Sequence, residues 1–128
     1  MKIYIAGPMR GRFCHNFLAF HYWEQVWRGG GWDVVNPARF DISEGRVQMD
    51  MDFVNGRFQP GQTIGQFMER DLPEVRECDA IFLMRDWDKS EGAKLERAEA
   101  ERCGKLVIVV DDFNITDGDG VVDGFIKD

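Results

Sequence analysis

Short, continuous apolar runs alternate along this chain with longer stretches in which apolar residues recur every three or four positions. Residues 80–84, Ala-Ile-Phe-Leu-Met, form the clearest run, which is typical of a strand buried on both faces. The pattern as a whole predicts strands over 2–6, 32–35, 80–84 and 106–110, and helices over about 16–27, 66–78 and 90–102.

Polar residues, glycines and prolines mark the ends of these elements. Asn16 is expected to cap the first helix, and the glycine run 29–31 to end it. Pro73 falls inside the second helical stretch, so that helix either kinks or restarts there. In the second case Asp71 caps the restart in a D-x-x-E box.

Two parts of the chain show no clear periodicity. Residues 38–65 are expected to form an irregular loop or insert, or to contain a short element that the pattern does not reveal. Residues 111–128 form an acidic, Gly-rich tail with a possible short element over 121–126. Within it, Thr-Asp-Gly-Asp-Gly at 116–120 is similar to a calcium loop but lacks the terminal glutamate, so a turn is expected.

The order of the predicted elements indicates one α/β domain over residues 1–128. Right-handed crossovers then favour a doubly wound, flavodoxin-like or Rossmann-like parallel sheet of four to five strands in the order 2-1-3-4, with helices on both faces. Ligands of such sheets bind beyond the carboxyl ends of the strands, where the strand order reverses. The loop 7–11 and the segment 86–92 are therefore expected to border one crevice.

Composition narrows the possible partners and the compartment. Lys and Arg number 16 against 23 Asp and Glu, a net charge of −7, so the basic face that nucleic-acid binding requires is not expected. Three widely spaced cysteines without a C-x-x-C motif favour a reducing, cytoplasmic compartment. No run approaches the roughly 20 apolar residues of a membrane span, and no signal sequence is expected.

The first candidate for chemistry is the segment Ala-Gly-Pro-Met-Arg-Gly, residues 6–11. Glycines after a first buried strand let the backbone approach a ligand closely, and the next helix directs its N-terminus toward the same place. Arg10 or Arg12 could hold a phosphate there. A plain tight turn with solvated arginines remains the alternative.

The second candidate is a pair of carboxylates. Glu96 shares one helix face with the small residues Ala93, Ala100 and Cys103, so it is expected to lie against the sheet, where an unpartnered carboxylate is costly. Asp71 is the other acid, with a cap as its alternative role. Two carboxylates beside one crevice are what glycosidic chemistry needs, although a structural role for both remains open.

Other residues point less clearly to a site. His15 and His21 are six residues apart, with no third ligand nearby, so a structural or surface role is expected and no metal site is predicted. Trp87 falls in the predicted crevice, where it either stacks on a base or belongs to the core.

Taken together, these motifs resemble the nucleoside 2-deoxyribosyltransferase superfamily. The resemblance rests on I-Y-I-A-G-P-M-R-G at the start, D-L at 71–72 before a C-D-A-I-F-L strand, and S-x-G-A-x-x-E before K-x-V-I-V. It is closest to the 2'-deoxynucleoside 5'-phosphate N-hydrolase branch and to short phage and bacterial relatives. It covers residues 2–37 and 66–110.

This resemblance implies roles for particular residues. Glu96 corresponds to the family's nucleophile, Asp71 to its catalytic aspartate, and Tyr4 to the tyrosine that contacts the nucleophile. Ser90 corresponds to the serine that holds the 5'-phosphate in the hydrolases. The remaining substrate-binding positions implied are Gly7, Met9, Arg10, Gly11 and Gly92, with Trp87 as a candidate for the base. Two departures from the family's pattern are Lys94, where a Gly is common, and Pro73.

The activity implied is retaining hydrolysis of the base–sugar bond of a nucleoside 5'-monophosphate, with no metal or organic cofactor. Homodimers or dimers of dimers are implied as well. Base exchange by a deoxyribosyltransferase is the first alternative, and a non-catalytic nucleotide-binding module on the same fold is the second.

Overall fold

Four parallel strands form the centre of the computed structural model, which describes residues 1–43, 51–57 and 63–112. The sheet contains β1 (Lys2–Ala6), β2 (Asp33–Val35), β3 (Ala80–Leu83) and β4 (Leu106–Val109). Their order is β2-β1-β3-β4, and Tyr4 of β1 lies in register with Val35 and Ile81 of its two neighbours. The α/β class, the parallel sheet and the strand order are confirmed.

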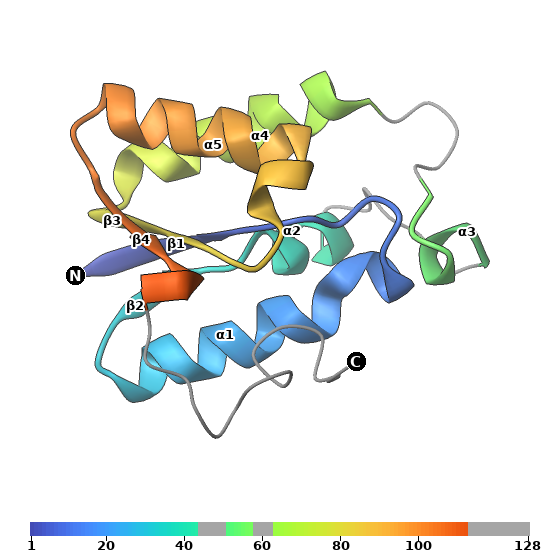
Figure 1. The fold of residues 1–128 in the computed structure, drawn as a ribbon, viewed down its shortest axis with the longest axis horizontal. Coiled ribbons are helices and arrows are strands. Elements are labelled where there is room, and N and C mark those ends of the chain that lie inside the picture. The colour runs from blue at the N-terminus through green and yellow to red at the C-terminus, as the bar shows by residue number, and fades with distance from the viewer. Residues whose placement is uncertain (44–50, 58–62, 113–128) are drawn as a thin grey trace.

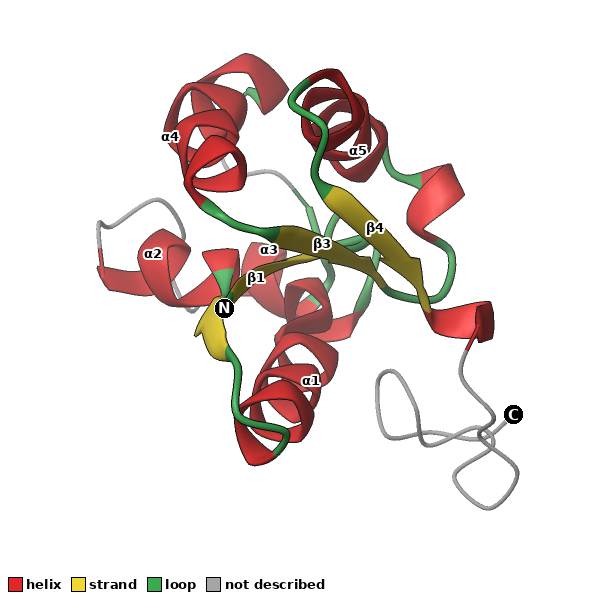
Figure 2. Ribbon diagram, turned by 90° about the vertical axis from the view of Figure 1, so that its left-hand side faces the viewer, coloured by secondary structure: helices red, strands yellow, loops and turns green. Residues whose placement is uncertain are grey.

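Helices cover both faces of this sheet. Helix α1 (Phe17–Gly29) lies on one face, whereas α4 (Ile64–Glu77) and α5 (Glu91–Arg102) lie side by side on the other (Figures 1 and 2). Alternation along β1 explains both layers, because successive side chains of a strand point to opposite faces. Ile3 and Ile5 join the core under α1, while Tyr4 and Ala6 join the core under α4 and α5.

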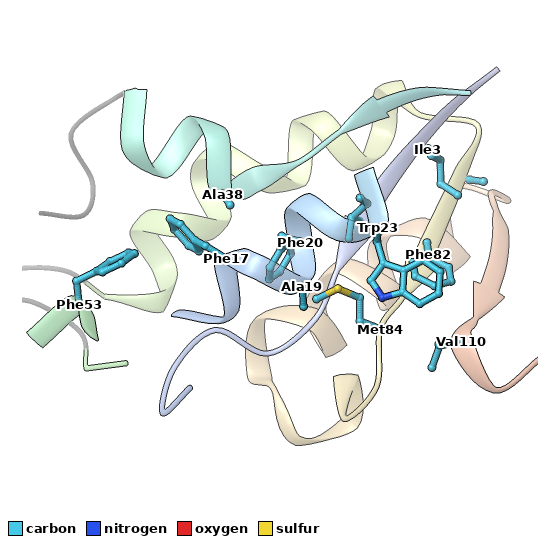
Figure 3. Close-up of a cluster of buried hydrophobic side chains, with 12 residues drawn as sticks. Ile3, Phe17, Ala19, Phe20, Trp23, Ala38, Phe53, Phe82, Met84 and Val110 are labelled. Atoms are coloured by element: carbon cyan, nitrogen blue, oxygen red, sulfur yellow. The ribbon is translucent and has the colours of Figure 1, made fainter. Parts of the chain in front are cut away.

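The core under α1 is rich in aromatic side chains (Figure 3). Trp23 packs against Phe82 of β3 with ring centroids 4.6 Å apart, and Phe17 meets Phe53 edge-on at 5.1 Å. Phe53 belongs to the short helix α3 (Met51–Val54), so this helix is attached to the domain through the same core.

The region 38–65 is more regular than its sequence indicated. It contains most of α2 (Pro37–Ser43) and all of α3, and α4 already begins at Ile64. Asn36 and Pro37, which the sequence indicated as the end of the second strand, also begin α2. The Asn36 side chain accepts a hydrogen bond from the Ala38 N–H at 3.0 Å, as an N-cap does, and Pro37 occupies the first helical position, where its missing N–H costs nothing.

Of the two predicted caps, Asn16 is right in position only, and Asp71 is wrong. Asn16 occupies the N-cap position of α1 as predicted, but its side chain makes no cap hydrogen bond and instead donates one to the Pro8 carbonyl at 3.0 Å. Helix α4 runs without a restart through Pro73, and its cap is Thr63, which forms a capping box with Gln66. Asp71 therefore lies in the middle of α4, where it is buried.

Other boundaries lie close to their predictions. Ser90 is the N-cap of α5, and Val110 belongs to a short 3-10 turn (Val110–Asp112) after β4. The possible element over 121–126, the turn at 116–120 and the tail from residue 113 lie outside the described residues. Within the described residues, no helix is both long enough and apolar enough to cross a membrane.

A buried charge joins α1 to the start of α2. Glu24 is 3% exposed and accepts hydrogen bonds from Arg39 at 2.7 Å, Arg28 at 2.8 Å and Asn36 at 3.0 Å. Burial acts to raise the pKa of Glu24, but these three donors outweigh it and lower the pKa from 4.5 to about 2. The ionised carboxylate is thus part of the folded structure.

Replacing Glu24 with glutamine is expected to lower the free energy of unfolding by roughly 2 kcal/mol at pH 7, because charge-assisted hydrogen bonds are lost. A depressed folded pKa stabilises the protein above the ordinary pKa of 4.5, and this stabilisation is lost as pH falls toward 2. Urea denaturation at pH 7 and pH 3 measures both effects, and the difference between variant and wild type should shrink at pH 3.

Glu101→Gln is the matched control for this change. Glu101 is exposed on α5 and pairs with Arg97 at 3.4 Å, so its loss should cost less than about 1 kcal/mol. Equal effects of the two substitutions at pH 7 would contradict the role given to Glu24.

Candidate active site

One pocket of about 290 Å³ opens at the carboxyl end of the sheet. Its walls come from segments that directly follow β1 and β2 and from the N-terminal half of α5, with α4 closing one side. This is where the strand order reverses and where ligands of such sheets bind. The described lining residues are Gly7, Pro8, Met9, Arg10, His15, Phe20, Pro37, Asp41, Ile64, Phe67, Met68, Asp71, Lys89, Ser90, Glu91, Gly92, Ala93 and Glu96.

Glu96 lies in the pocket wall and is 5% exposed. It faces the sheet because it follows Ala93 by three positions on the buried face of α5. There Tyr4 of β1, which is completely buried, donates a hydrogen bond from its hydroxyl to Oε2 of Glu96. The β1 side chain thus holds the carboxylate in one orientation.

Two further carboxylates share this pocket. Asp71 of α4 is 5% exposed and Asp41 of α2 is 1% exposed, and both line the pocket with Glu96. Burial raises the pKa of Glu96 well above its ordinary value, and the negative charge of Asp71 raises it further, whereas the hydrogen bond from Tyr4 opposes both effects. In this setting Glu96 binds its proton more tightly than an ordinary glutamate does.

Tyr4 stays protonated next to these acids. Burial raises the pKa of Tyr4 well above 10, and the charges of Glu96 and Asp71 add to the effect. Its hydroxyl is therefore a permanent donor to Glu96 at neutral pH, and it has no role in taking a proton from a ligand.

Another part of the pocket lining consists of backbone and of the cations Arg10 and Lys89, the latter also paired with Asp86 at 3.4 Å. The turn from Gly7 to Arg10 lies beside the first turn of α5, where Ser90 accepts a hydrogen bond from the Ala93 N–H at 3.1 Å. Because Oγ acts as acceptor in this cap, the Ser90 hydroxyl hydrogen can still be donated to a ligand. A helix N-terminus with nearby Arg10 and Lys89 is suited to an anion.

Gly7 lies so close to Met84 that the structure leaves no room for a side chain at this position. A Cβ on Gly7 would lie 2.4 Å from Cε and 3.0 Å from Cβ of Met84, the residue after β3. The turn after β1 therefore packs directly on Met84. A side chain at position 7 would push this part of the pocket wall away from the end of β3.

Arg12 and Trp87, two other candidates, do not line this pocket. Arg12 pairs with Asp86 at 3.0 Å and so joins the turn after β1 to the turn after β3. Trp87 packs at the edge of the core under α5, with the guanidinium of Arg97 4.6 Å from its ring centroid. This position corrects the expectation that Trp87 faces the crevice, because its ring packs against the core and Arg97 and does not line the pocket.

Gly11 also lies outside the pocket lining, where it attaches the turn to α3. Its N–H donates to the carbonyl of Gly56 at 2.5 Å. Gly56 adopts a left-handed conformation with φ of +73°, and a Cβ there would lie 2.4 Å from the backbone N and O of Arg12. The segment after α3 therefore supports the turn after β1 from behind.

A family model described as a domain of unknown function, DUF4406, matches residues 1–109 of the chain. The chain belongs to the DUF4406 family. No curated protein matches it. The DUF4406 match spans every described residue of the pocket.

Two pocket residues of this DUF4406 domain were missed by sequence reasoning. Asp41 belongs to the stretch that was expected to be irregular, and the Asn-Pro helix start at 36–37 was the signal that could have placed it on a helix. His15 was expected to be structural or at the surface, but it is buried and lines the pocket. No local sequence signal distinguishes it from an ordinary core histidine.

The described residues of the DUF4406 domain contain no group of three or more His, Cys, Asp and Glu side chains arranged to hold a metal ion. The arrangement instead combines paired carboxylates with an anion-accepting helix end. Such a pocket can hold an anionic small molecule at one end and place an electrophilic carbon beside Glu96 at the other.

Proposed function

We propose that this protein hydrolyses the N-glycosidic bond of a 2'-deoxynucleoside 5'-monophosphate, with Glu96 as the nucleophile. The observation that carries the proposal is the buried carboxylate of Glu96, oriented by the Tyr4 hydroxyl and facing the same pocket as Asp71. A carboxylate in this setting costs several kcal/mol of desolvation, which a purely structural glutamine would avoid.

The proposed phosphate position is the turn from Gly7 to Arg10 together with the first turn of α5. Glu96 follows Ser90 by six residues, about 9 Å along the helix axis at the usual rise per residue. One helix thus offers an anion site at its N-terminus and a carboxylate further along, a separation that suits a sugar phosphate whose C1' lies next to Glu96.

The reaction proceeds in two steps. A Glu96 oxygen attacks C1' while the bond from C1' to the base nitrogen breaks, and Asp71 supplies a proton to the leaving base. The resulting ester between the sugar and Glu96 is then attacked at C1' by water, which gives its proton to Asp71 as the carboxylate leaves. The electrostatic effect of Asp71 on the pKa of Glu96 supports these roles, because it indicates that both acids lie close enough to act on one substrate.

Pocket size supports a mononucleotide over a polymer. A volume of about 290 Å³ lies at the low end of small-molecule pockets, which span about 300–1,000 Å³. The net charge of −7 also argues against affinity for a nucleic acid, whose binding depends on many phosphate contacts.

Incubating the protein with a panel of deoxynucleoside monophosphates, ribonucleoside monophosphates and free deoxynucleosides tests the proposal. Chromatography should detect free base and sugar phosphate from the deoxynucleoside monophosphates, at rates that fall when the 5'-phosphate is missing. Base exchange with an added acceptor base, without hydrolysis, would instead indicate a transferase. Thermal stabilisation by nucleotides without turnover of any of them would indicate a binding module.

A further inference from the structure

His15 is a pocket residue to which the proposed reaction assigns nothing. It is 3% exposed, and its ring stacks on Phe53 with centroids 5.0 Å apart and meets Phe17 at 6.0 Å. Cys14, His15 and Asn16 all have left-handed backbones, with φ of +49°, +53° and +62°. Three such residues in a row are energetically unfavourable, and the conformation brings the His15 side chain to the pocket.

The surroundings of the His15 ring indicate which of its nitrogens carries the proton. The backbone of Arg57 acts to raise the pKa of His15, as a carbonyl that accepts a hydrogen bond from a ring N–H does. Nε2 is buried and has no hydrogen-bond partner among the described residues, so we assign the ring N–H that faces the Arg57 carbonyl to Nδ1. In neutral imidazole, a proton on Nδ1 leaves Nε2 as an acceptor.

We propose that Nε2 of His15 is a recognition site that accepts a hydrogen bond from a neutral O–H or N–H group of the bound nucleotide. This inference rests on the proposed function for the class of ligand. Its physical basis is the cost of a buried polar atom without a partner, which a ligand donor in the pocket removes.

An acceptor role fits the surroundings better than a role as a phosphate-binding cation. The ring is enclosed by Phe53 and Phe17, and burial lowers the pKa of His15, although the Arg57 carbonyl opposes this effect. Arg10 and Lys89 already supply positive charge to the pocket. A neutral His15 therefore selects ligands by a donor group, while the cations and the start of α5 receive the phosphate.

Two ligand groups have the required chemistry, the 3'-hydroxyl of the sugar and an exocyclic amino group of the base. Pairs of substrates that differ in one group distinguish them, namely deoxynucleoside against 2',3'-dideoxynucleoside monophosphate, and dAMP against its purine analogue without the amino group. For the wild type, kcat/KM should differ about 10-fold within one of the two pairs. This is the fold-change expected when one neutral hydrogen bond is lost.

His15→Asn should remove this difference. Asparagine tolerates the left-handed backbone at position 15 but is too short to replace Nε2, so the variant keeps its fold and loses the acceptor. Discrimination within the sensitive pair should fall to less than about twofold, with the second pair unaffected. Equal discrimination by the wild type and the variant, or none in either pair for the wild type, would overturn the proposal.

Nitrogen-15 NMR of the histidine rings tests the same idea without turnover. Asn36 donates to Nδ1 of His21 at 3.2 Å, with its own Oδ1 engaged by the Ala38 N–H, so His21 should carry its proton on Nε2. The two histidines are thus expected in opposite tautomers, and His21 is an internal control. Addition of dAMP or dTMP to the Glu96→Gln variant should shift only the Nε2 resonance of His15.

A proton on Nε2 of His15, in the free protein or with nucleotide bound, would contradict the inference. This outcome is separate from a failure of the proposed function. If no substrate is cleaved by the wild type but nucleotide binding still moves the unprotonated Nε2 resonance, the recognition role stands and the hydrolysis proposal falls.

Discussion

Replacing Glu96 with glutamine is expected to lower the rate of base release at least about 10³-fold and, at the same time, to raise the stability of the protein at neutral pH. The loss of rate follows from the proposed chemistry, because an amide oxygen does not form the sugar ester. The gain in stability follows from burial. Glutamine can still accept the hydrogen bond from Tyr4 but carries no charge that must be desolvated beside Asp71.

The pH dependence of this stability has a definite sign. The pKa of Glu96 is raised in the folded protein, so the folded state binds this proton more tightly than the unfolded state does. Stability is therefore fully present below the ordinary value of 4.5 and is lost as pH rises through the folded pKa. The advantage of Glu96→Gln in melting temperature should grow from pH 5 to pH 8, by roughly 4 °C for each kcal/mol.

Glu101→Gln is again the matched control, since Glu101 lies exposed on the same helix and outside the pocket. It should leave both the rate and the slope of melting temperature against pH unchanged. Intact-protein mass spectrometry of the wild type, quenched during turnover, should reveal an added sugar phosphate that is missing from Glu96→Gln, and peptide mapping should locate it on Glu96. Base release by Glu96→Gln at the wild-type rate would exclude Glu96 as the nucleophile.

Replacing Gly56 with alanine is expected to cause the second large effect, although Gly56 does not line the pocket. The left-handed backbone alone costs an alanine roughly 1–2 kcal/mol. The added Cβ would also overlap the backbone of Arg12, which a side-chain rotation does not relieve. We expect a loss of at least about 3 kcal/mol in the free energy of unfolding.

The activity of Gly56→Ala should also fall, because Gly56 supports the turn that is proposed to hold the phosphate. Moving the segment after α3 away from Arg12 breaks the hydrogen bond from Gly11 to the Gly56 carbonyl. A displacement of about 1 Å in a substrate-binding turn costs up to about 10²-fold in rate, which should be seen mainly as a higher KM for the monophosphate. Free deoxynucleosides, which lack the phosphate, should be affected less.

Gly104→Ala separates backbone strain from steric overlap. Gly104 has a similar φ of +69°, but a Cβ there would have nothing within 4 Å, and the residue follows α5 at the end away from the pocket. It should cost only the roughly 1–2 kcal/mol of the left-handed conformation and leave kcat/KM unchanged. If both variants lose the same stability and keep full activity, the support that Gly56 gives to the turn is unimportant.

Much of the fold could be predicted from local pattern. The continuous apolar run at 80–84 and the small-residue face around Ala93 each indicate burial by themselves, and parallel strands with right-handed crossovers leave few possible orders. The same reasoning places Glu96 against the sheet, because helical spacing is a property of the local chain. For Asp71 it left two possibilities open, a buried position beside Met68 and Val75 or a cap before Pro73, and only the packing of α4 shows that the helix continues.

The sequence by itself determined the α/β class, the strand order and the burial of Glu96, because these follow from periodicities of two and 3.6 residues and from chain connectivity. The contact of Tyr4 with Glu96, 92 residues away, was implied by the family resemblance and by no pattern within the chain, and the tertiary structure shows it. Only the tertiary structure placed Asp41 and His15 in the same pocket. Contacts of this kind depend on how separate elements pack, and no local interval in the chain encodes them. For the same reason, the support of the turn after β1 by Gly56 became visible only in three dimensions.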